Sequence, residues 1–577
     1  MANKKAVLSR PTPDASLPRN AFDRESVREF HYALGQLAPA WWEAFTAGSH
    51  VKLNRKIFQR TSQLNTAAFP ILDTHIQYYF VPYRLLWSLW DDFRLGIQDI
   101  NSTGLLPMAA QSSTGRVSMP TRVPYTTIQD ILTTLQNMNT NAQKDIFGYP
   151  AEYNAAKLLN LLGYGMPNAM SPTATGDVNL WPLLAYHKIY YDHFRNSQYE
   201  SNMALAYNMD YLSTFGQSSP MKVPQADLER SYNGLLSMHY VNYRNDYFNN
   251  MYPSLNYISS SALQGSIGAP GVNYGVAIGL PTNLVDALSG PNHVDQMGVV
   301  PTQNSVFLTQ PIPGSNNWAQ FNLNTLRASF ALDKLLRSSA YAPQHVKQQY
   351  EARYGIKYKV NPSESVYIGA FKSDIQIGEV TSTSDTINGN AGAGLGAIGG
   401  KGVGFDDWGK TLEFTCQEDG IIMAMCYSTI RSNYRSLGID SYLVKHLPED
   451  YFVPEYQNLG LEPVYGQELN YSLGQTTILG YRPRNQRYKL GIDKSYGLFA
   501  DMTQDLSMFI NHTDVSRLPA VGQNGVNYGW FKMKPSDLDG ITVSSYDGTW
   551  STDQFFGQVV FGCTSIQNMS VHGQPSL

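Results

Sequence analysis

The chain has 577 residues and a formal net charge of −4 at pH 7, with 42% hydrophobic and only 15% charged residues. This length exceeds an ordinary single domain, so the chain needs several domains or one core with very long insertions, and its composition excludes an intrinsically disordered protein. Aromatic residues reach 12%, including 38 tyrosines, which favours surfaces that are buried against other proteins.

The distribution of charge and the cysteine content further limit the kinds of protein that this chain can be. Residues 1–60 hold ten basic and five acidic side chains, so this segment is basic within an acidic chain. The three cysteines include no C-x-x-C pair, which argues against a disulfide framework or a zinc site and favours a reducing compartment. We also expect neither a signal peptide nor a bilayer-spanning segment, because the apolar runs are too short.

The first part of the chain predicts an arm followed by strands. Residues 1–26 are Pro-rich and basic, which predicts an extended arm. Strand patterns fill 27–82: apolar and basic residues alternate over 50–64, and 75–82 is aromatic and β-branched. Apolar residues at helical spacing over 84–93 predict a short helix.

The segment from about 95 to 320 predicts a long insertion of mixed structure. Helical patterns occur at 125–138, 151–164 and 181–200. Residues 205–320 are rich in Asn, Tyr, Ser and Gly and have little periodicity. Such a long aperiodic stretch within a folded protein is usually functional, so we take it as a candidate surface-exposed insertion.

The second half predicts alternating strands and loops after one more helix. The helix is expected at 322–355, a strand at 366–385 and a glycine-rich inserted loop at about 386–410. Residues 411–430 read as strand, Asp-Gly turn and buried strand. Residues 476–492 predict another strand pair or a single long bent strand.

One stretch, GFDDWGKT at 404–411, matches the spacing of a phosphate-binding loop through Gly404, Gly409, Lys410 and Thr411. Such a loop works between a buried strand and a helix N-terminus. The preceding run is glycine-rich with no β-branched strand, and the following residues alternate as in a strand. Asp406 and Asp407 would also repel a triphosphate. We therefore interpret the match as false and the segment as a loop between strands.

No other pattern assembles a catalytic or metal site. The sequence contains no H-E-x-x-H, G-x-S-x-G or EF-hand pattern. His187 and His193 are six residues apart, a poor match to one helical face, and are expected to pack as polar core residues. No catalytic residue, metal or cofactor is expected.

Several stretches share their order and spacing with one known family. They are THIQYYFVPYRLLWSLWDDF (74–93), PLLAYHKIYYDHFRNSQYE (182–200), LNTLRASFALDKLLRSSAY (323–341), YIGAFKSDIQIGEVTSTSD (367–385), GGKGVG (399–404), EDGIIMAMCYSTIRSNY (418–434), EDYFVPEYQNLGLEPVYGQEL (449–469) and LGYRPRNQRYKLGIDKSYGLF (479–499). The series resembles the major capsid protein of microviruses, small single-stranded DNA bacteriophages, especially their gokushovirus-like branches. The match fades over 205–320 and after about 515.

The resemblance implies a mainly β fold, an eight-stranded antiparallel viral jelly roll with long insertions that contain several helices. The domain would cover 27–515, with 516–577 as a C-terminal extension. It also implies a structural, non-enzymatic subunit that self-assembles into an icosahedral shell around single-stranded DNA. This shell would form in the host bacterial cytoplasm and reside in the virion. Implied partners are other copies, spike, DNA-binding or scaffolding proteins, and the host surface through exposed loops.

The basic arm has three open interpretations. Lys4, Lys5, Arg10 and Arg19 are candidates for neutralising DNA phosphates. The arm could equally grip a neighbouring subunit or have no partner. For the whole chain, the alternative to a capsid subunit is a carbohydrate-binding or tail-fibre-like β-rich module, and a nucleotide-hydrolysing enzyme is disfavoured.

Overall fold

A computed structural model describes most of the chain. The described residues are 19–64, 71–95, 123–165, 176–211, 222–228, 234–253, 363–381, 398–457, 460–500, 525–526 and 528–571, with five single residues between 334 and 355. The arm up to residue 18 and the helix expected at 322–355 therefore lie outside the described residues, apart from those single positions.

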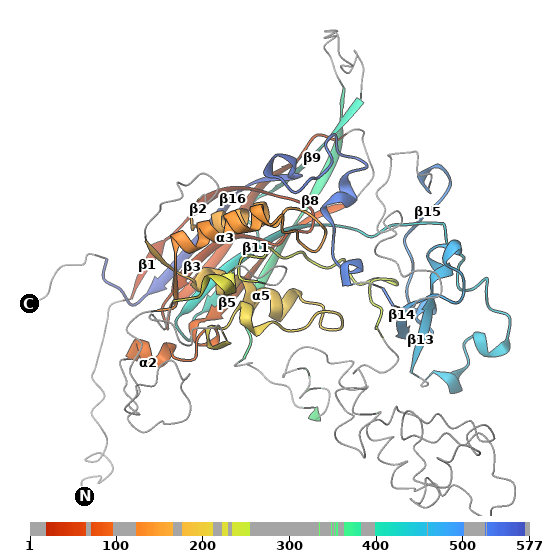
Figure 1. Ribbon diagram of the computed structural model, residues 1–577, viewed down its shortest axis with the longest axis horizontal. Helices are drawn as coiled ribbons and strands as arrows, with labels where there is room; N and C mark the ends of the chain where they lie inside the picture. The colour runs from red at the N-terminus through yellow and green to blue at the C-terminus, as the bar shows by residue number, and fades with distance from the viewer. Residues whose placement is uncertain are drawn as a thin grey trace, which may run out of the picture.

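A single ten-stranded antiparallel sheet forms the centre of the molecule (Figure 1), and it curls into two halves, which we call the first and the second sheet. The first sheet has the order β2–β16–β4–β9, with bounds Ser26–Tyr32, Phe555–Gln567, His50–Thr61 and Ile398–Asp406. The second has the order β3–β11–β5–β8, with bounds Ala38–Phe45, Gly420–Ile430, Leu72–Pro82 and Val366–Thr381. Two short strands extend the first sheet: β1 (Asn20–Asp23) pairs with β16 and β10 (Leu412–Thr415) pairs with β4. These eight long strands confirm the expected jelly roll.

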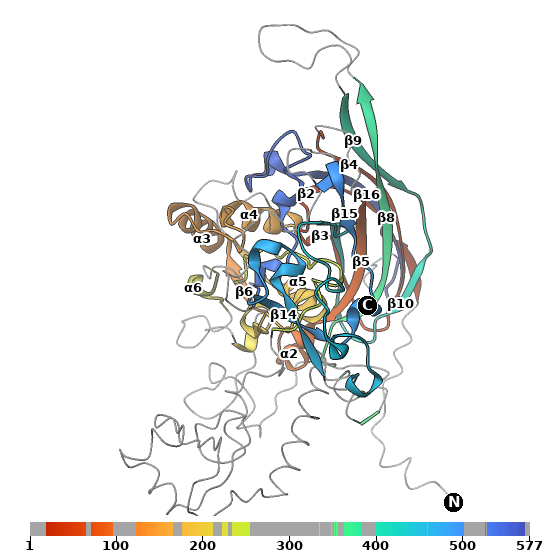
Figure 2. The ribbon, with the colours of Figure 1, turned by 90° about the vertical axis from the view of Figure 1, so that its right-hand side faces the viewer.

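The long strand β8 joins the two sheets. It pairs with β5 over residues 366–375 and with β9 over residues 376–381. The β8–β9 end projects beyond the rest of the strands in Figure 2. The sheets consequently curl into one another along this side.

Side chains alternate between the core and the outside along the strands of the first sheet. In β4, Val51, Leu53 and Ile57 are buried between the sheets, whereas Lys52 and Phe58 point outward. This is the period of two that the sequence predicted for residues 50–64.

Trp41 connects the two sheets through the core. Its indole, on β3, stacks on Phe561 of β16 at 5.9 Å between ring centroids. It also meets Tyr78 of β5 edge-on at 6.2 Å. The side chain is 1% exposed, so one aromatic group contacts strands of both sheets.

Helices of the insertion between β5 and β8 lie on one side of the sheets (Figure 2). The principal ones are α3 (Ile128–Thr140), α4 (Ala151–Leu161) and α5 (Trp181–Ile189), and they share one hydrophobic core with β11. The strand β11 is therefore buried on both faces, which explains its continuous apolar sequence. The same insertion holds α2 (Trp90–Leu95), α6 (Gln225–Leu228), β6 (Tyr125–Thr127) and β7 (Asp177–Asn179).

A second insertion connects β11 to β16 and forms its own small core. Its strands are β12 (Tyr434–Arg435), β13 (Leu461–Tyr465), β14 (Ile478–Pro483) and β15 (Lys494–Ser495). Phe248, from the first insertion, packs with Val464 and Trp530 in this second cluster. The two insertions thus contact each other beside the jelly roll.

The helices expected at 125–138 and 151–164 are confirmed, and the third helical pattern gives α5 followed by one π-helical turn, Tyr190–Phe194. Within 84–93 the α-helix begins only at Trp90. Among the described residues, no helix is long and apolar enough to cross a bilayer.

Three expectations need correction. The inserted loop at 386–410 contains β9, because the strand runs through glycines that carry no β-branched signal. Only 478–483 of the stretch 476–492 is strand, and it pairs with the upstream β13. The segment 516–577, expected to be a C-terminal extension outside the jelly roll, contributes a strand to it. This strand, β16, lies inside the first sheet and pairs with β4 from residue 555 to 566. The jelly roll therefore extends to Gln567.

Gly402 of β9 faces the crowded corner where the sheets meet. A Cβ atom there would lie 2.6 Å from Thr61 Cγ2 and 3.0 Å from Ile375 Cγ2. We expect Gly402→Val to lower the free energy of unfolding by about 1–3 kcal/mol through overpacking. Thermal and denaturant unfolding would measure this change in stability. Gly378→Ala, at a position with no atom within 4 Å, is the control, and equal losses in both variants would contradict this account.

Removing the Trp41 indole should have a larger effect. Trp41→Ala leaves a cavity between the sheets, with an expected loss of about 3–5 kcal/mol. Trp408→Ala is a matched control, because that indole is 44% exposed and should change stability little. Denaturant unfolding of both variants tests this, and a Trp41→Ala protein as stable as the control would show that the core does not depend on this contact.

Candidate assembly and nucleic-acid surface

The outer side of the first sheet carries a group of aromatic and basic side chains. Directly paired residues of antiparallel strands share a face: Arg60 pairs with Phe556 and Val403, and Phe58 pairs with Gln558 and Phe405. We call this surface the exposed sheet face; its residues include Lys52, Lys56, Phe58, Arg60, Lys401, Val403, Phe405, Phe556 and Gln558, with Trp408 from the loop after β9 and the acidic Glu29 of β2, which pairs with Gln558.

Its aromatic rings are open to solvent. Phe58 is 47% exposed, Phe405 60% and Trp408 44%. Cations lie close to the rings: Lys56 Nζ is 5.6 Å from the Phe405 ring centroid, and Arg60 Cζ is 6.0 Å from that of Phe556. Exposed rings with adjacent cations are the elements from which single-stranded nucleic-acid surfaces are built.

Part of the positive charge is already neutralised. Lys52 Nζ lies 2.9 Å from Glu413 Oε1, and Lys56 Nζ lies 3.4 Å from Asp407 Oδ1. The hydrogen bond from Lys52 lowers the pKa of Glu413. Arg60 and Lys401 have no carboxylate partner in the part of the chain that the structure describes. These two cations are available to an anionic ligand such as a phosphate.

Sequence reasoning did not find this surface. The alternation of basic residues along 50–64 is visible in the sequence, but Phe405 and Trp408 stand within the stretch that matches the phosphate-loop spacing. Their position opposite Phe58 depends on the register of β4 with β9, strands more than three hundred residues apart.

Of the four candidate arm residues, the described part of the chain includes only Arg19. Its Nη2 donates to the backbone oxygen of Gly48 at 3.0 Å, beside the start of β4. Lys4, Lys5 and Arg10 lie outside the described residues.

The stretch 404–411, which has the spacing of a phosphate-binding loop, forms the end of one strand and the loop that leads to the next strand. β9 ends at Asp406 and β10 begins at Leu412. Asp406 pairs with inward-facing Arg55 at 2.6 Å, while Asp407 pairs with outward-facing Lys56. No helix begins within the described residues 398–430. The residues Gly404, Gly409, Lys410 and Thr411 therefore form no cradle at a helix N-terminus.

His187 and His193, the two histidines of the third helical pattern, are bonded to different protein groups. His187 Nδ1 is 2.8 Å from His239 Nε2, and its Nε2 donates to the Leu235 carbonyl at 2.7 Å. Burial lowers the pKa of His187 to about 4, so it is neutral at pH 7. His193 Nε2 contacts the Ser365 backbone oxygen at 3.0 Å. The described residues include no cluster of three or more metal-ligating side chains.

The region 205–320 differs from expectation where it is described. In 234–253, Tyr240, Tyr247 and Phe248 are buried. Tyr247 donates to Glu468 Oε2 at 2.6 Å. Tyrosines that satisfy their hydroxyls with buried carboxylates can form a core without any periodic pattern, so this part is packed and not an exposed loop. Residues 254–320 lie outside the described residues.

Comparisons with known proteins agree with this architecture. The family model described as capsid protein (F protein) matches residues 12–162 and 163–577, which include every strand of both sheets. The capsid protein VP1 of Chlamydia phage 1 is 21% identical to the chain, and the match covers 89% of each protein. The chain belongs to the capsid protein (F protein) family and has the structural role of a major capsid subunit.

Proposed function

We propose that copies of this chain close into an icosahedral shell around a single-stranded DNA genome, with the exposed sheet face directed at the DNA. The observation that carries the proposal is the contrast between the two sheets. Helices cover the second sheet, whereas the first presents bare rings and cations. A solvent-exposed apolar surface of this kind usually has a ligand or partner.

Single-stranded DNA fits the chemistry of this face. Unpaired bases can stack on Phe58, Phe405 and Trp408, each stacked base contributing about 1–3 kcal/mol. Phosphates can pair with Arg60 and Lys401. Neighbouring strands lie about 4.8 Å apart, so Phe58 and Phe405, which are direct partners across β4 and β9, can support adjacent bases.

The basic arm extends the same proposal. Arg19 is held at the Gly48 end of β4, and β1 continues along β16, so the arm leaves from the end of the first sheet. We propose that Lys4, Lys5, Arg10 and Arg19 bind further phosphates there. An arm that grips a neighbouring subunit is the alternative, and it would leave DNA affinity unchanged when the arm is deleted.

The remaining partners follow from the capsid role. We propose that residues of 205–320 beyond the packed part reach the host surface, since loops on a rigid β scaffold commonly carry recognition. Spike, DNA-binding or scaffolding proteins would assist assembly. The three cysteines are free and buried, which suits assembly in the reducing host cytoplasm. The role needs no enzymatic turnover.

Charge reversal on the exposed sheet face should weaken DNA binding. We expect Lys56→Glu with Arg60→Glu to reduce affinity for an oligothymidylate and to flatten its salt dependence by about 0.7 for each phosphate that the variant no longer binds. Fluorescence anisotropy between 50 and 200 mM salt measures both quantities. Lys489→Glu, an exposed residue on the second insertion, is the matched control.

The contribution of base stacking to DNA affinity is tested with a second variant. Phe58→Ala with Phe405→Ala should lower affinity about tenfold or more while leaving the salt slope unchanged, because stacking contributes about 1–3 kcal/mol per base and carries no charge. If both this variant and the charge-reversed protein bind as the unmodified chain does, the exposed sheet face is not the DNA surface.

A further inference from the structure

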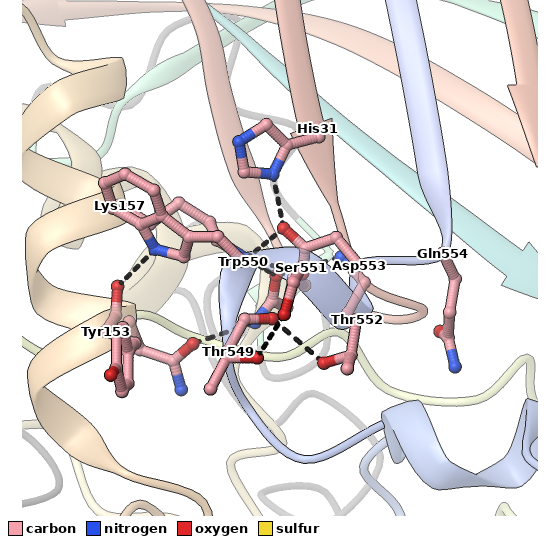
Figure 3. Close-up of polar contacts among 12 residues, drawn as sticks. His31, Tyr153, Lys157, Thr549, Trp550, Ser551, Thr552, Asp553 and Gln554 are labelled. Atoms are coloured by element: carbon pink, nitrogen blue, oxygen red, sulfur yellow. Dashed lines mark hydrogen bonds and ion pairs between the residues drawn. The ribbon is translucent and has the colours of Figure 1, made fainter. Parts of the chain in front are cut away.

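A buried lysine and a buried aspartate meet where α4 approaches the start of β16 (Figure 3). Lys157 Nζ lies 2.7 Å from Asp553 Oδ1 and 2.6 Å from Asp553 Oδ2. The Lys157 side chain is 3% exposed and that of Asp553 0%. Gln36 Oε1 accepts a further hydrogen bond from Lys157 Nζ at 3.1 Å, which holds the amine against the carboxyl group.

A third titratable group touches the same carboxyl. His31, on β2, contacts Asp553 Oδ2 through Nδ1. Its side chain is 37% exposed, so the imidazole connects a buried oxygen with solvent. Trp550 closes the site beside it: the indole meets the His31 ring edge-on at 6.0 Å and donates to the Tyr153 carbonyl at 3.0 Å.

The surroundings of Lys157 shift its amine toward the uncharged form. Burial lowers the pKa of Lys157, and the Asp553 carboxylate partly offsets this effect. A desolvated lysine is a nucleophile. Groups held in contact react with effective concentrations of about 10⁵–10⁸ M. The arrangement thus places a nucleophile and an acyl carbon together in a buried site, with a proton carrier between this site and solvent.

We propose that Lys157 and Asp553 condense in the folded subunit to an intramolecular isopeptide bond, with His31 carrying the proton. Proton transfer from the ammonium to the carboxylate first gives an amine and a carboxylic acid. The Nζ lone pair then attacks Cγ, forming the N–C bond. A second proton moves from nitrogen to the departing oxygen by way of His31, the C–O bond breaks and water leaves. The product is an amide that keeps one N–H, and no cofactor or oxidant is consumed.

The bond would join distant parts of the chain. Lys157 and Asp553 are separated by 396 positions, and they belong to the first insertion and to the end of the second. A cross-link there would fix both insertions to the jelly roll. All three cysteines are free, so this covalent link would do what a disulfide does in secreted proteins and would tolerate a reducing compartment.

A second buried pair provides an internal comparison. Lys188 Nζ lies 2.9 Å from Asp192 Oδ1 on α5 and the following turn, with side chains 7% and 9% exposed. The other oxygen of Asp192 accepts hydrogen bonds from the Ser365 backbone N–H and hydroxyl, both at 2.8 Å. Those donors occupy the Asp192 oxygen whose counterpart in Asp553 is contacted by His31. We expect this pair to remain an ion pair.

Mass spectrometry of the full chain under denaturing conditions tests the proposal. The expected mass is about 18 Da below the sequence value, the mass of one water molecule. Peptide mapping should yield one branched peptide joining Lys157 to Asp553, with Lys188 and Asp192 in linear peptides. A chain at its full sequence mass would overturn the proposal, whether or not any variant folds.

Variants at Lys157, Asp553 and His31 distinguish the part that each residue plays in forming the bond. Lys157→Met and Asp553→Ala should restore the full sequence mass, whereas Asp553→Asn should lose about 17 Da, because ammonia then leaves in place of water. His31→Ala should lower the linked fraction at early times after synthesis. A His31→Ala chain that links as fast as the unmodified protein would overturn the assignment of His31 as proton carrier. None of these readouts depends on shell assembly or DNA binding.

Discussion

The structure depends on the pairing of β16 between β2 and β4. The first sheet is completed only when residues near the C-terminus pair with strands near the N-terminus. Contacts between residues so far apart in the sequence form slowly, because closing the long loop between them costs conformational entropy. Both long insertions are therefore loops whose ends are fixed by strands of one closed core, and their helices and small sheets pack onto that core and onto each other.

This constraint gives the two sheets different surroundings. The insertion helices cover the second sheet, so β11 is an interior strand that is buried on both faces. On the outer face of the first sheet, where none of the described helices packs, rings and cations lie in register across β16, β4 and β9. A subunit of this kind has one side suited to its own insertions and another suited to partners, as the role of a capsid protein requires.

Sequence reasoning recovered the elements with strong local signals. The alternation along 50–64 predicted β4, and the helical periods predicted α3 and α4. β9 was missed because Gly402 and its neighbours carry no strand propensity, although the crowded corner at Thr61 excludes a larger side chain. β16 was missed because the family resemblance fades before it. The exposed sheet face and the Lys157–Asp553 contact are products of non-local register, which no local pattern encodes.

The central claim is that this jelly roll is a shell subunit with its exposed sheet face directed inward. Electron cryomicroscopy of particles from cells that produce the chain with its companion virion proteins tests this most directly. We expect closed icosahedral shells in which β2, β16, β4 and β9 face the interior and density for DNA contacts Phe58 and Phe405. Shells with this face on the outside, or a chain that remains a small oligomer and binds glycans, would contradict the account.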